Sequence, residues 1–536
     1  MWWSKGGTLR RGLALLLGFV VLLTIPTGAA SSSPGEGGEL RGDLDGILED
    51  PRLGGATVGV VVRDPRSDRV LYARNPRTRM TPASNAKLFT SVAALETLGR
   101  DFRFDTEVLT TGDRRGSELR GDLYLRGSGD PTMLAADYEE LAADVAESGI
   151  DVVRGRVFAD DSWFTGPELA NGWMAVDEPY HYAAPVSALT VAPTDDYDAG
   201  SVVVRARPGK PDRPVRVSTS PPTGAVTVVN RARTTRAGSA ESLSVRREHG
   251  SDRVLVSGEL PAESGERRFF SSVPDPTRYA LDVFRRALAE HGVSFEGVGT
   301  SRTPEQARVL AEHRSMPLGE LLTPFLKLSN NGHAETLVKT MGRRVLGEGN
   351  WTAGMKVLRS ELESLGVDPG GHRLVDGSGL STLDTVSPRQ LSLLLDAARE
   401  EPWFDTWYAA LPVAGEPERL VGGTLRGRME GTAAEGEVVA KTGSMTGVTA
   451  LSGYVRTRSE RPLVFSVVFN DFLGAAPRDV QDAIAVRLAE HGGDVSSGRG
   501  DPNAREGSPP ATSEGRDGSG AEVGGSSLEC SWIKSC

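Results

Sequence analysis

Residues 84–98 read SNAKLFTSVAALETL, a segment in which leucine and valine recur at steps of three and four residues. This spacing predicts a helix with one apolar, buried face. Ser84 and Lys87 stand three positions apart at its start, so their side chains lie on the same face of the helix. An amine that contacts a hydroxyl can remove its proton during attack on a carbonyl. The pair is therefore a candidate nucleophile and base.

The Ser-x-x-Lys spacing alone is weak evidence, because it recurs by chance at residues 531–534. A second segment, Ser329-Asn330-Asn331, lies between an apolar run and a helical pattern, and it can present a hydroxyl and an amide to one cleft. The alternative is that these side chains only cap the helix, since Ser and Asn accept hydrogen bonds from free helix-end amides. Considered alone, the segment favours the cap.

A third segment, Lys441-Thr442-Gly443-Ser444, follows an apolar run and precedes a predicted strand at 449–455. A lysine, two hydroxyls and a glycine on a strand edge can bind a carboxylate while the backbone approaches the substrate closely. The alternative is an ordinary solvated edge strand or turn. Considered alone, this segment also favours the structural interpretation.

The three segments in this order form the motif combination of penicillin-binding proteins and related β-lactamases. The chain resembles the low-molecular-mass, class C penicillin-binding proteins, the D-alanyl-D-alanine carboxypeptidase/endopeptidase family of the actinomycete type. This resemblance implies an α/β (α+β) fold: a penicillin-binding/β-lactamase-like transpeptidase domain whose central antiparallel sheet is flanked by helices, with inserted β-rich domains. It extends from about residue 40 to about residue 490 and includes the stretches 121–132, 376–381, 411–415 and 423–429.

The resemblance implies a role for three side chains in the chemical step. Ser84 would attack the carbonyl of a peptide ending in D-Ala-D-Ala, form an acyl-enzyme and release D-alanine. Lys87 would be the general base for that attack. Ser329 would relay a proton between the lysines and the leaving amine.

Other residues of the three motifs would bind the substrate, again by resemblance. Asn331 would hydrogen-bond the peptide amide, while Lys441 with Thr442 and Ser444 would receive the terminal carboxylate. The backbone N–H groups of Ser84 and Ser444 would form the oxyanion hole, aimed at charge that develops only in the tetrahedral state.

Two features concern the substrate's side chain. Relatives often carry an arginine immediately after the Asp-Gly-Ser-Gly-Leu-Ser string, whereas this chain has Thr382, which puts the family preference in doubt. In the stretch 173–182, Asp177 could contact an ammonium group on the peptide while Tyr182 packs against its aliphatic part. The alternative is an exposed acidic turn beside packed aromatic residues.

By the same resemblance, β-lactam antibiotics should acylate Ser84 and remain bound as covalent inhibitors. We find no candidate for a dedicated deacylating glutamate, which argues against an efficient β-lactamase. Two alternatives stay open: a β-lactamase, and a non-catalytic wall-binding or scaffold protein that kept the fold. No metal or organic cofactor is implied.

Composition excludes several other classes. The formal net charge is −11, which argues against a nucleic-acid partner, because such binding relies on cationic side chains. The two cysteines, Cys530 and Cys536, stand in the last seven residues, so the body of the chain holds no thiolate metal site or disulfide framework. The seven histidines form no His-Glu-x-x-His motif. The sequence does not indicate which oligomeric state the protein has.

The ends of the chain resemble processing and linker segments. Residues 1–30 combine basic residues, an apolar run and small residues, as in a secretory signal peptide, and an uncleaved anchor is the alternative. The protein is therefore predicted to be secreted into the cell envelope. Small and polar residues at 31–38 predict a flexible spacer, and those at 492–536 predict a disordered tail.

The body is predicted to be a catalytic domain split by an insertion. The catalytic parts are 39–100 and 300–491, and residues 101–299 are a β-rich insertion of two subdomains. A hairpin is predicted at 56–72. The other elements expected from periodicity are strands at 449–455 and 463–469 and helices at 279–291, 318–328, 334–346, 355–365, 390–399 and 480–490.

Overall fold

The computed structural model describes residues 36–492. The predicted signal peptide, residues 1–30, lies outside the described residues, as do residues 31–35 of the predicted spacer and 493–536 of the predicted tail. Helix α1 spans Glu36–Ile47, so the prediction of a flexible spacer is wrong for residues 36–38. Leu40 and Leu44 of this helix are buried, and that burial offsets the cost of ordering the segment.

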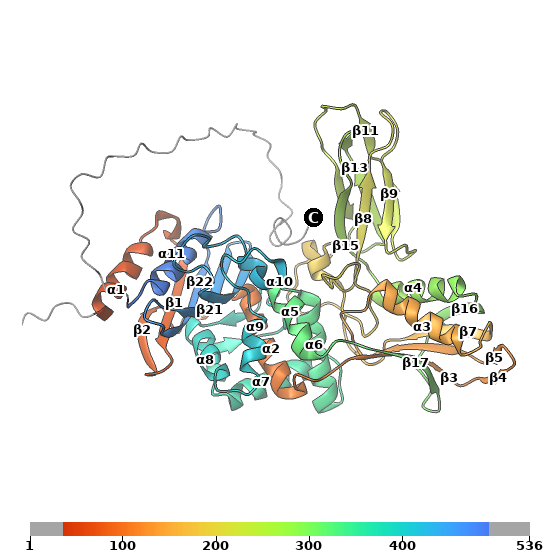
Figure 1. The fold of residues 1–536 in the computed structure, drawn as a ribbon, viewed down its shortest axis with the longest axis horizontal. Coiled ribbons are helices and arrows are strands. Elements are labelled where there is room, and N and C mark those ends of the chain that lie inside the picture. Colours follow the sequence, from red (N-terminus) through yellow and green to blue (C-terminus); the bar gives the residue numbers. More distant parts are fainter. Residues whose placement is uncertain (1–35, 493–536) are drawn as a thin grey trace, which may run out of the picture.

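A five-stranded antiparallel sheet forms the centre of the predicted catalytic domain, with strand order β2-β1-β22-β21-β20. The pairing of β1 with β22 joins the two ends of the described chain (Figure 1). The predicted central antiparallel sheet and its first hairpin are confirmed. The strands are β1 (Thr57–Asp64), β2 (Arg69–Arg74), β20 (Val438–Met445), β21 (Val448–Arg456) and β22 (Pro462–Asn470).

Helices cover both faces of this sheet, and alternate strand residues pack against each layer. Val464 and Val468 of β22 contact the layer that contains α2, whereas Phe465 and Val467 contact the layer of α1 and α11. This alternation is the two-residue period of a strand buried on both faces. The helices are α2 (Ala86–Leu98), α5 (Leu318–Lys327), α6 (Asn331–Leu346), α7 (Trp351–Ser364), α8 (Pro388–Ala398), α9 (Phe404–Ala409), α10 (Arg419–Gly422) and α11 (Arg478–Ala489).

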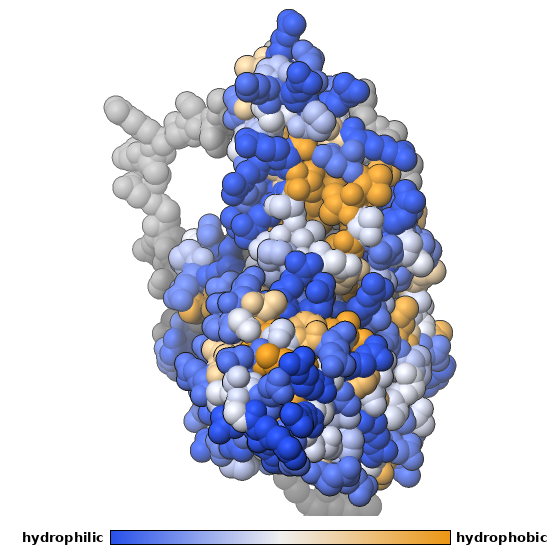
Figure 2. Space-filling model, turned by 90° about the vertical axis from the view of Figure 1, so that its right-hand side faces the viewer, coloured by the Kyte–Doolittle hydropathy of each residue, from blue (hydrophilic) through white to orange (hydrophobic). Residues whose placement is uncertain are grey.

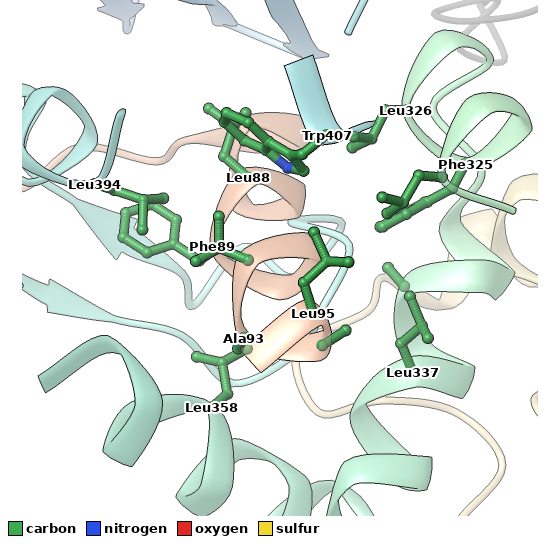
Figure 3. Close-up of a cluster of buried hydrophobic side chains, with 14 of the residues drawn as sticks. Leu88, Phe89, Ala93, Leu95, Phe325, Leu326, Leu337, Leu358, Leu394 and Trp407 are labelled. Carbon is green, nitrogen blue, oxygen red and sulfur yellow. The ribbon is translucent and has the colours of Figure 1, made fainter. Parts of the chain in front are cut away.

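Helix α2 is the most enclosed of these elements. The sequence predicts one buried face, but residues 86–95 are all buried, because α6, α7 and α8 surround the helix together with the sheet. Figure 3 shows Leu88 and Leu95 of α2 among Phe325, Leu337 and Trp407 from neighbouring helices. A helix packed on all sides holds its first residues in a fixed position, and those residues include the candidate base.

The inserted region is built on a second sheet of seven strands, with order β17-β3-β6-β7-β5-β4 and β16 paired to β7. Strand β17 (Arg308–Arg314) pairs with β3 and so extends the insertion beyond the predicted boundary at 299. Helix α3 (Ala135–Glu147) was not predicted. The other strands are β3 (Asp105–Thr110), β4 (Asp113–Arg115), β5 (Glu118–Arg120), β6 (Leu123–Gly127), β7 (Val152–Asp160) and β16 (Ser294–Thr300).

Three small sheets stand beside the large one and extend away from the catalytic domain (Figure 1). They share one hydrophobic core with the seven-stranded sheet, α3 and α4 (Pro276–Glu290), whose first turn is capped by the Asp275 carboxylate. The outer face of the insertion is largely hydrophilic with separate apolar patches (Figure 2). The strands are β8 (Ser201–Arg207), β9 (Arg216–Ser220), β10 (Thr227–Asn230), β11 (Arg233–Thr235), β12 (Ser244–Arg247), β13 (Arg253–Ser257), β14 (Glu259–Pro261) and β15 (Arg267–Ser272).

Two further features complete the description. Strands β18 (His372–Arg373) and β19 (Thr385–Val386) pair at the base of a loop that reaches the candidate site. Among the helices between residues 36 and 492, none is long and apolar enough to cross a membrane. All six helices predicted from periodicity are present within a few residues of their expected bounds.

Candidate active site

Ser84 lies in a 3-10 turn, Ala83–Asn85, that leads directly into α2. One turn later Lys87, which is 0% exposed, donates from Nζ to Ser84 Oγ at 2.8 Å. The same nitrogen donates to Asn331 Oδ1 at 2.6 Å and to the Ser378 carbonyl at 2.9 Å. The hydroxyl and the amine are thus in contact, as the three-residue spacing predicts, and the amine is held by acceptors from two other segments.

Ser329 and Asn331 precede and begin α6. Ser329 has a positive φ of 59°, which turns the chain sharply before the helix. Asn330, the N-cap residue of α6, makes no capping hydrogen bond with its side chain, so the interpretation as a simple helix cap is wrong. Instead, Asn331 accepts from Lys87, and Ser329 Oγ accepts from Lys441 Nζ at 2.9 Å.

Strand β20 lies at one edge of the central sheet, beside β21, and carries Lys441, Thr442 and Ser444. Lys441 is 0% exposed, so the interpretation as a solvated edge strand is wrong. A Cβ at Gly443 would lie 2.8 Å from the Pro82 carbonyl, so only glycine lets the strand pack against the turn that holds Ser84. Thr442 Oγ1 donates to Thr424 Oγ1 at 2.8 Å.

These segments meet at a cavity of about 270 Å³. Ser84, Asn331 and Ser444 line it, and Ser444 Oγ accepts from Arg478 Nη2 at 3.2 Å. A guanidinium beside an open hydroxyl suits an anionic group. The remaining lining residues are Met174, Asp177, Tyr182, Gly379, Leu380, Thr382, Met445 and Thr446.

Asp177 and Tyr182 come from the insertion and line this cavity. The Tyr182 hydroxyl donates to Asp177 Oδ1 at 3.0 Å, and the Tyr182 carbonyl accepts from Asn331 Nδ2 at 2.8 Å. Asp177 is 5% exposed, so it is not part of an exposed acidic turn. Burial raises the pKa of its carboxyl above the usual value.

Sequence reasoning missed several groups that hold the site. Arg478 and Thr424 contact two of the carboxylate-binding candidates. Arg478 stands in no recognisable motif, and Thr424 lies in the stretch 423–429, which contributes to the resemblance without indicating this contact. The Ser378 carbonyl contacts Lys87, and the buried Glu335 and Asp376 carboxylates lie behind it. Asp376 lies in the stretch 376–381, which contributes to the family resemblance, but the sequence spacing does not predict which groups its carboxylate contacts.

One group of side chains among the described residues has donor atoms close enough to hold a metal ion: Asp137, Glu140 and His313. These residues lie in the inserted region, and none of them lines the cavity.

Comparisons with known proteins identify the family of the chain. Residues 40–491 match the model of the D-Ala-D-Ala carboxypeptidase 3 (S13) family. The chain is 45% identical to a D-alanyl-D-alanine carboxypeptidase of Actinomadura sp. (strain R39), over 99% of this chain and 97% of that one. It is 28% identical to the D-alanyl-D-alanine carboxypeptidase DacB of Haemophilus influenzae, over 78% and 86% of the two chains.

The fold is also that of a solved relative. The crystal structure of penicillin-binding protein 4 (dacB) from Haemophilus influenzae superimposes with a TM-score of 0.72 at 24% identity, covering 83% of this chain and 98% of that chain. The predicted penicillin-binding fold is confirmed, and the carboxypeptidase is favoured over the β-lactamase and the non-catalytic scaffold. From its catalytic sheet to its insertion, the chain belongs to the D-Ala-D-Ala carboxypeptidase 3 (S13) family.

Proposed function

We propose that this carboxypeptidase acts on peptidoglycan stem peptides ending in D-Ala-D-Ala, through an acyl-enzyme on Ser84. The observation that carries the proposal is the 2.8 Å contact between Ser84 Oγ and Lys87 Nζ beside the cavity. An alcohol becomes an effective nucleophile when a neighbouring base takes its proton during attack.

In the acylation step, Ser84 Oγ attacks the carbonyl carbon of the penultimate D-alanine, and the hydroxyl proton passes to Lys87 Nζ, which acts as the base after it has given up one of its own protons. The backbone N–H groups of Ser84 and Ser444 stabilise the oxyanion that forms. Collapse of the tetrahedral state breaks the peptide bond, and the Ser329 hydroxyl delivers a proton to the leaving D-alanine. The 2.9 Å contact of Ser329 with Lys441 supports this relay. Water then hydrolyses the ester and regenerates the Ser84 hydroxyl.

The terminal carboxylate of the substrate binds Lys441, Thr442 and Ser444 in this account. The 3.2 Å contact from Arg478 to Ser444 supports an anionic ligand at that end of the cavity. Asn331 hydrogen-bonds the substrate amide. Asp177 receives an ammonium group of the stem peptide, and Tyr182 packs beside its aliphatic part.

We further propose that β-lactams acylate Ser84 and persist there. A β-lactam complex has been solved for the Haemophilus influenzae relative, which has the same fold. Glu335, a carboxylate near the base, is 0% exposed and accepts from Trp351 and from two backbone amides, and it does not line the cavity. Such a group is poorly placed to activate a deacylating water.

Export into the cell envelope completes the proposal. The basic and apolar order of residues 1–30 supports it, since that order is typical of a secretory signal. A stem-peptide hydrolase needs to reach the cell wall, where its substrate lies.

The test is release of D-alanine from a synthetic peptide ending in D-Ala-D-Ala. We expect Ser84→Ala to lower kcat by about 10⁴-fold or more, because the acyl-enzyme cannot form. The matched control is Ser531→Ala, which removes the serine of the second Ser-x-x-Lys tetrad and should leave kcat unchanged. Equal activity of the wild type and Ser84→Ala would refute the proposal.

A further inference from the structure

Loop 375–384 contacts the candidate base and forms part of the wall of the cavity. It connects β18 to β19, and its Ser378 carbonyl accepts the hydrogen bond from Lys87 Nζ at 2.9 Å. Three other residues of the same loop line the cavity. A Cβ at Gly379 would lie 1.9 Å from the Ala83 carbonyl, so the loop packs directly on the turn that presents the nucleophile.

Glu335 fixes one part of this loop from α6, one turn after Asn331. Its Oε1 accepts from the Ser378 N–H at 2.8 Å, and its Oε2 accepts from the Gly377 N–H at 3.0 Å. The indole of Trp351 donates to Oε2 at 2.7 Å. Two consecutive backbone amides bound to one carboxylate leave the peptide between them little freedom to rotate.

Asp376 fixes the next peptide unit, which carries the carbonyl that contacts Lys87. Its Oδ1 accepts from the Gly379 N–H at 2.7 Å, and its Oδ2 accepts from the Ser381 N–H at 2.7 Å. The Ser378 carbonyl and the Gly379 N–H belong to the same planar peptide, so a bond to one orients the other. Asp376 thereby sets the direction of the acceptor for the amine.

Asp376 also connects the loop to the insertion. Its Oδ2 accepts from Trp173 Nε1 at 2.8 Å, and the Ser381 hydroxyl donates to the Asn171 carbonyl at 2.8 Å. Met174, the residue after this tryptophan, lines the cavity. The wall that the insertion contributes is therefore tied to the same carboxylate that orients the Ser378 carbonyl.

These two carboxylates are both 0% exposed, and burying such charges is costly unless they are well hydrogen-bonded. Burial raises the pKa of Glu335 to about 7, and the Asp376 charge adds to the effect. An apolar core would be less costly at this place. The carboxylates instead accept from six backbone and indole donors, which connect them to the loop beside the base and to the cavity wall.

We propose that Glu335, Asp376 and Trp173 are positioning residues for the reaction, an inference that rests on the proposed function. Glu335 and Asp376 hold the Ser378 carbonyl in place for Lys87. Trp173 holds the insertion's wall segment against Asp376 and so shapes the substrate cavity.

The two arms of the proposal predict different kinetic changes, with kcat and KM measured for a peptide ending in D-Ala-D-Ala and the acylation rate measured with a fluorescent penicillin. Trp173→Phe removes one donor to a charged group and should raise KM for the peptide about tenfold with kcat unchanged. Glu335→Gln should lower kcat and the acylation rate together by about 10²-fold with little change in KM, because the base is displaced. If Glu335→Gln does not fold, Trp351→Phe removes one donor to the same carboxylate and should lower kcat in the same direction.

Trp403→Phe is the matched control. The Trp403 indole donates to the Glu96 carboxylate over 2.7 Å, and neither residue lines the cavity. It should keep wild-type kcat and KM. An unchanged KM in Trp173→Phe, a wild-type kcat in the Glu335 arm, or equal losses in all variants including the control would overturn the inference. A wild-type enzyme that releases no D-alanine and is not acylated would overturn the proposed function instead.

Discussion

Buried cations are satisfied differently in the catalytic domain and in the inserted region. Lys87 donates to a hydroxyl, an amide oxygen and a carbonyl, and Lys441 donates to a hydroxyl and a carbonyl. In the insertion, Arg247 is 1% exposed and pairs with the Glu178 carboxylate at 2.7 Å. An amine among neutral acceptors can lose its proton without leaving a carboxylate unpaired, whereas a guanidinium stays charged. The first arrangement suits proton transfer, and the second suits structure.

Of the substitutions that test this comparison of buried cations, removing the base should have the largest effect. Lys87→Ala should lower the rate of acylation by about 10²- to 10⁴-fold, the usual contribution of a general base. Stopped-flow measurement with a fluorescent penicillin checks this, and Lys534→Ala, from the second tetrad, is the control. If Lys87→Ala is acylated at the wild-type rate, this lysine is structural like Arg247, and the comparison fails.

Removing the cation of the insertion should affect stability instead. Arg247→Met leaves the Glu178 carboxylate without its buried partner, which typically costs about 3–5 kcal/mol of unfolding free energy. Chemical denaturation measures that loss. D-alanine release per folded molecule, counted by penicillin titration, should stay at the wild-type value. A stable Arg247→Met protein with a low kcat would reverse the assignment of the two regions.

A smaller effect is expected where the two regions meet, at Asp177. Asp177→Asn should raise KM by about fivefold for peptides with a free side-chain amine. This change corresponds to ~1 kcal/mol of binding free energy, as expected for a partly screened ion pair. The KM for peptides whose side-chain amine is acetylated should not change. Because burial raises the pKa of this carboxyl, the wild-type preference should disappear as the pH falls, at a higher pH than for an ordinary aspartate. If the two kinds of peptide have equal KM values in the wild type and also in Asp177→Asn, the proposed contact between Asp177 and the ammonium group is wrong.

Much of the catalytic domain could be predicted because its elements carry strong local signals. The apolar spacing of α2 and the nearly continuous apolar run of strand β22 are visible in the sequence, and the three motifs are close to helix and strand ends. Helix α3 was missed although Tyr138, Leu141 and Val145 follow helical spacing, because the surrounding β-rich texture dominated the interpretation. Strand β17 was missed because its pairing with β3 joins residues about 200 positions apart.

The candidate site could be predicted in its reactive groups but not in its support. Ser84 and Lys87 are neighbours in one helical turn, so their contact follows from spacing. Glu335 and Asp376 lie on different elements, and their shared contact with loop 375–384 depends on tertiary packing that no local pattern reports. The same holds for Arg478, which reaches Ser444 from α11.

The central claim is that the Ser84 hydroxyl becomes covalently acylated. Intact-protein mass spectrometry after incubation with penicillin, followed by peptide mapping, tests it most directly. We predict one adduct, on the peptide that contains Ser84, and none in Ser84→Ala. An adduct that persists in Ser84→Ala, or a wild-type protein that gains no mass, would contradict the account.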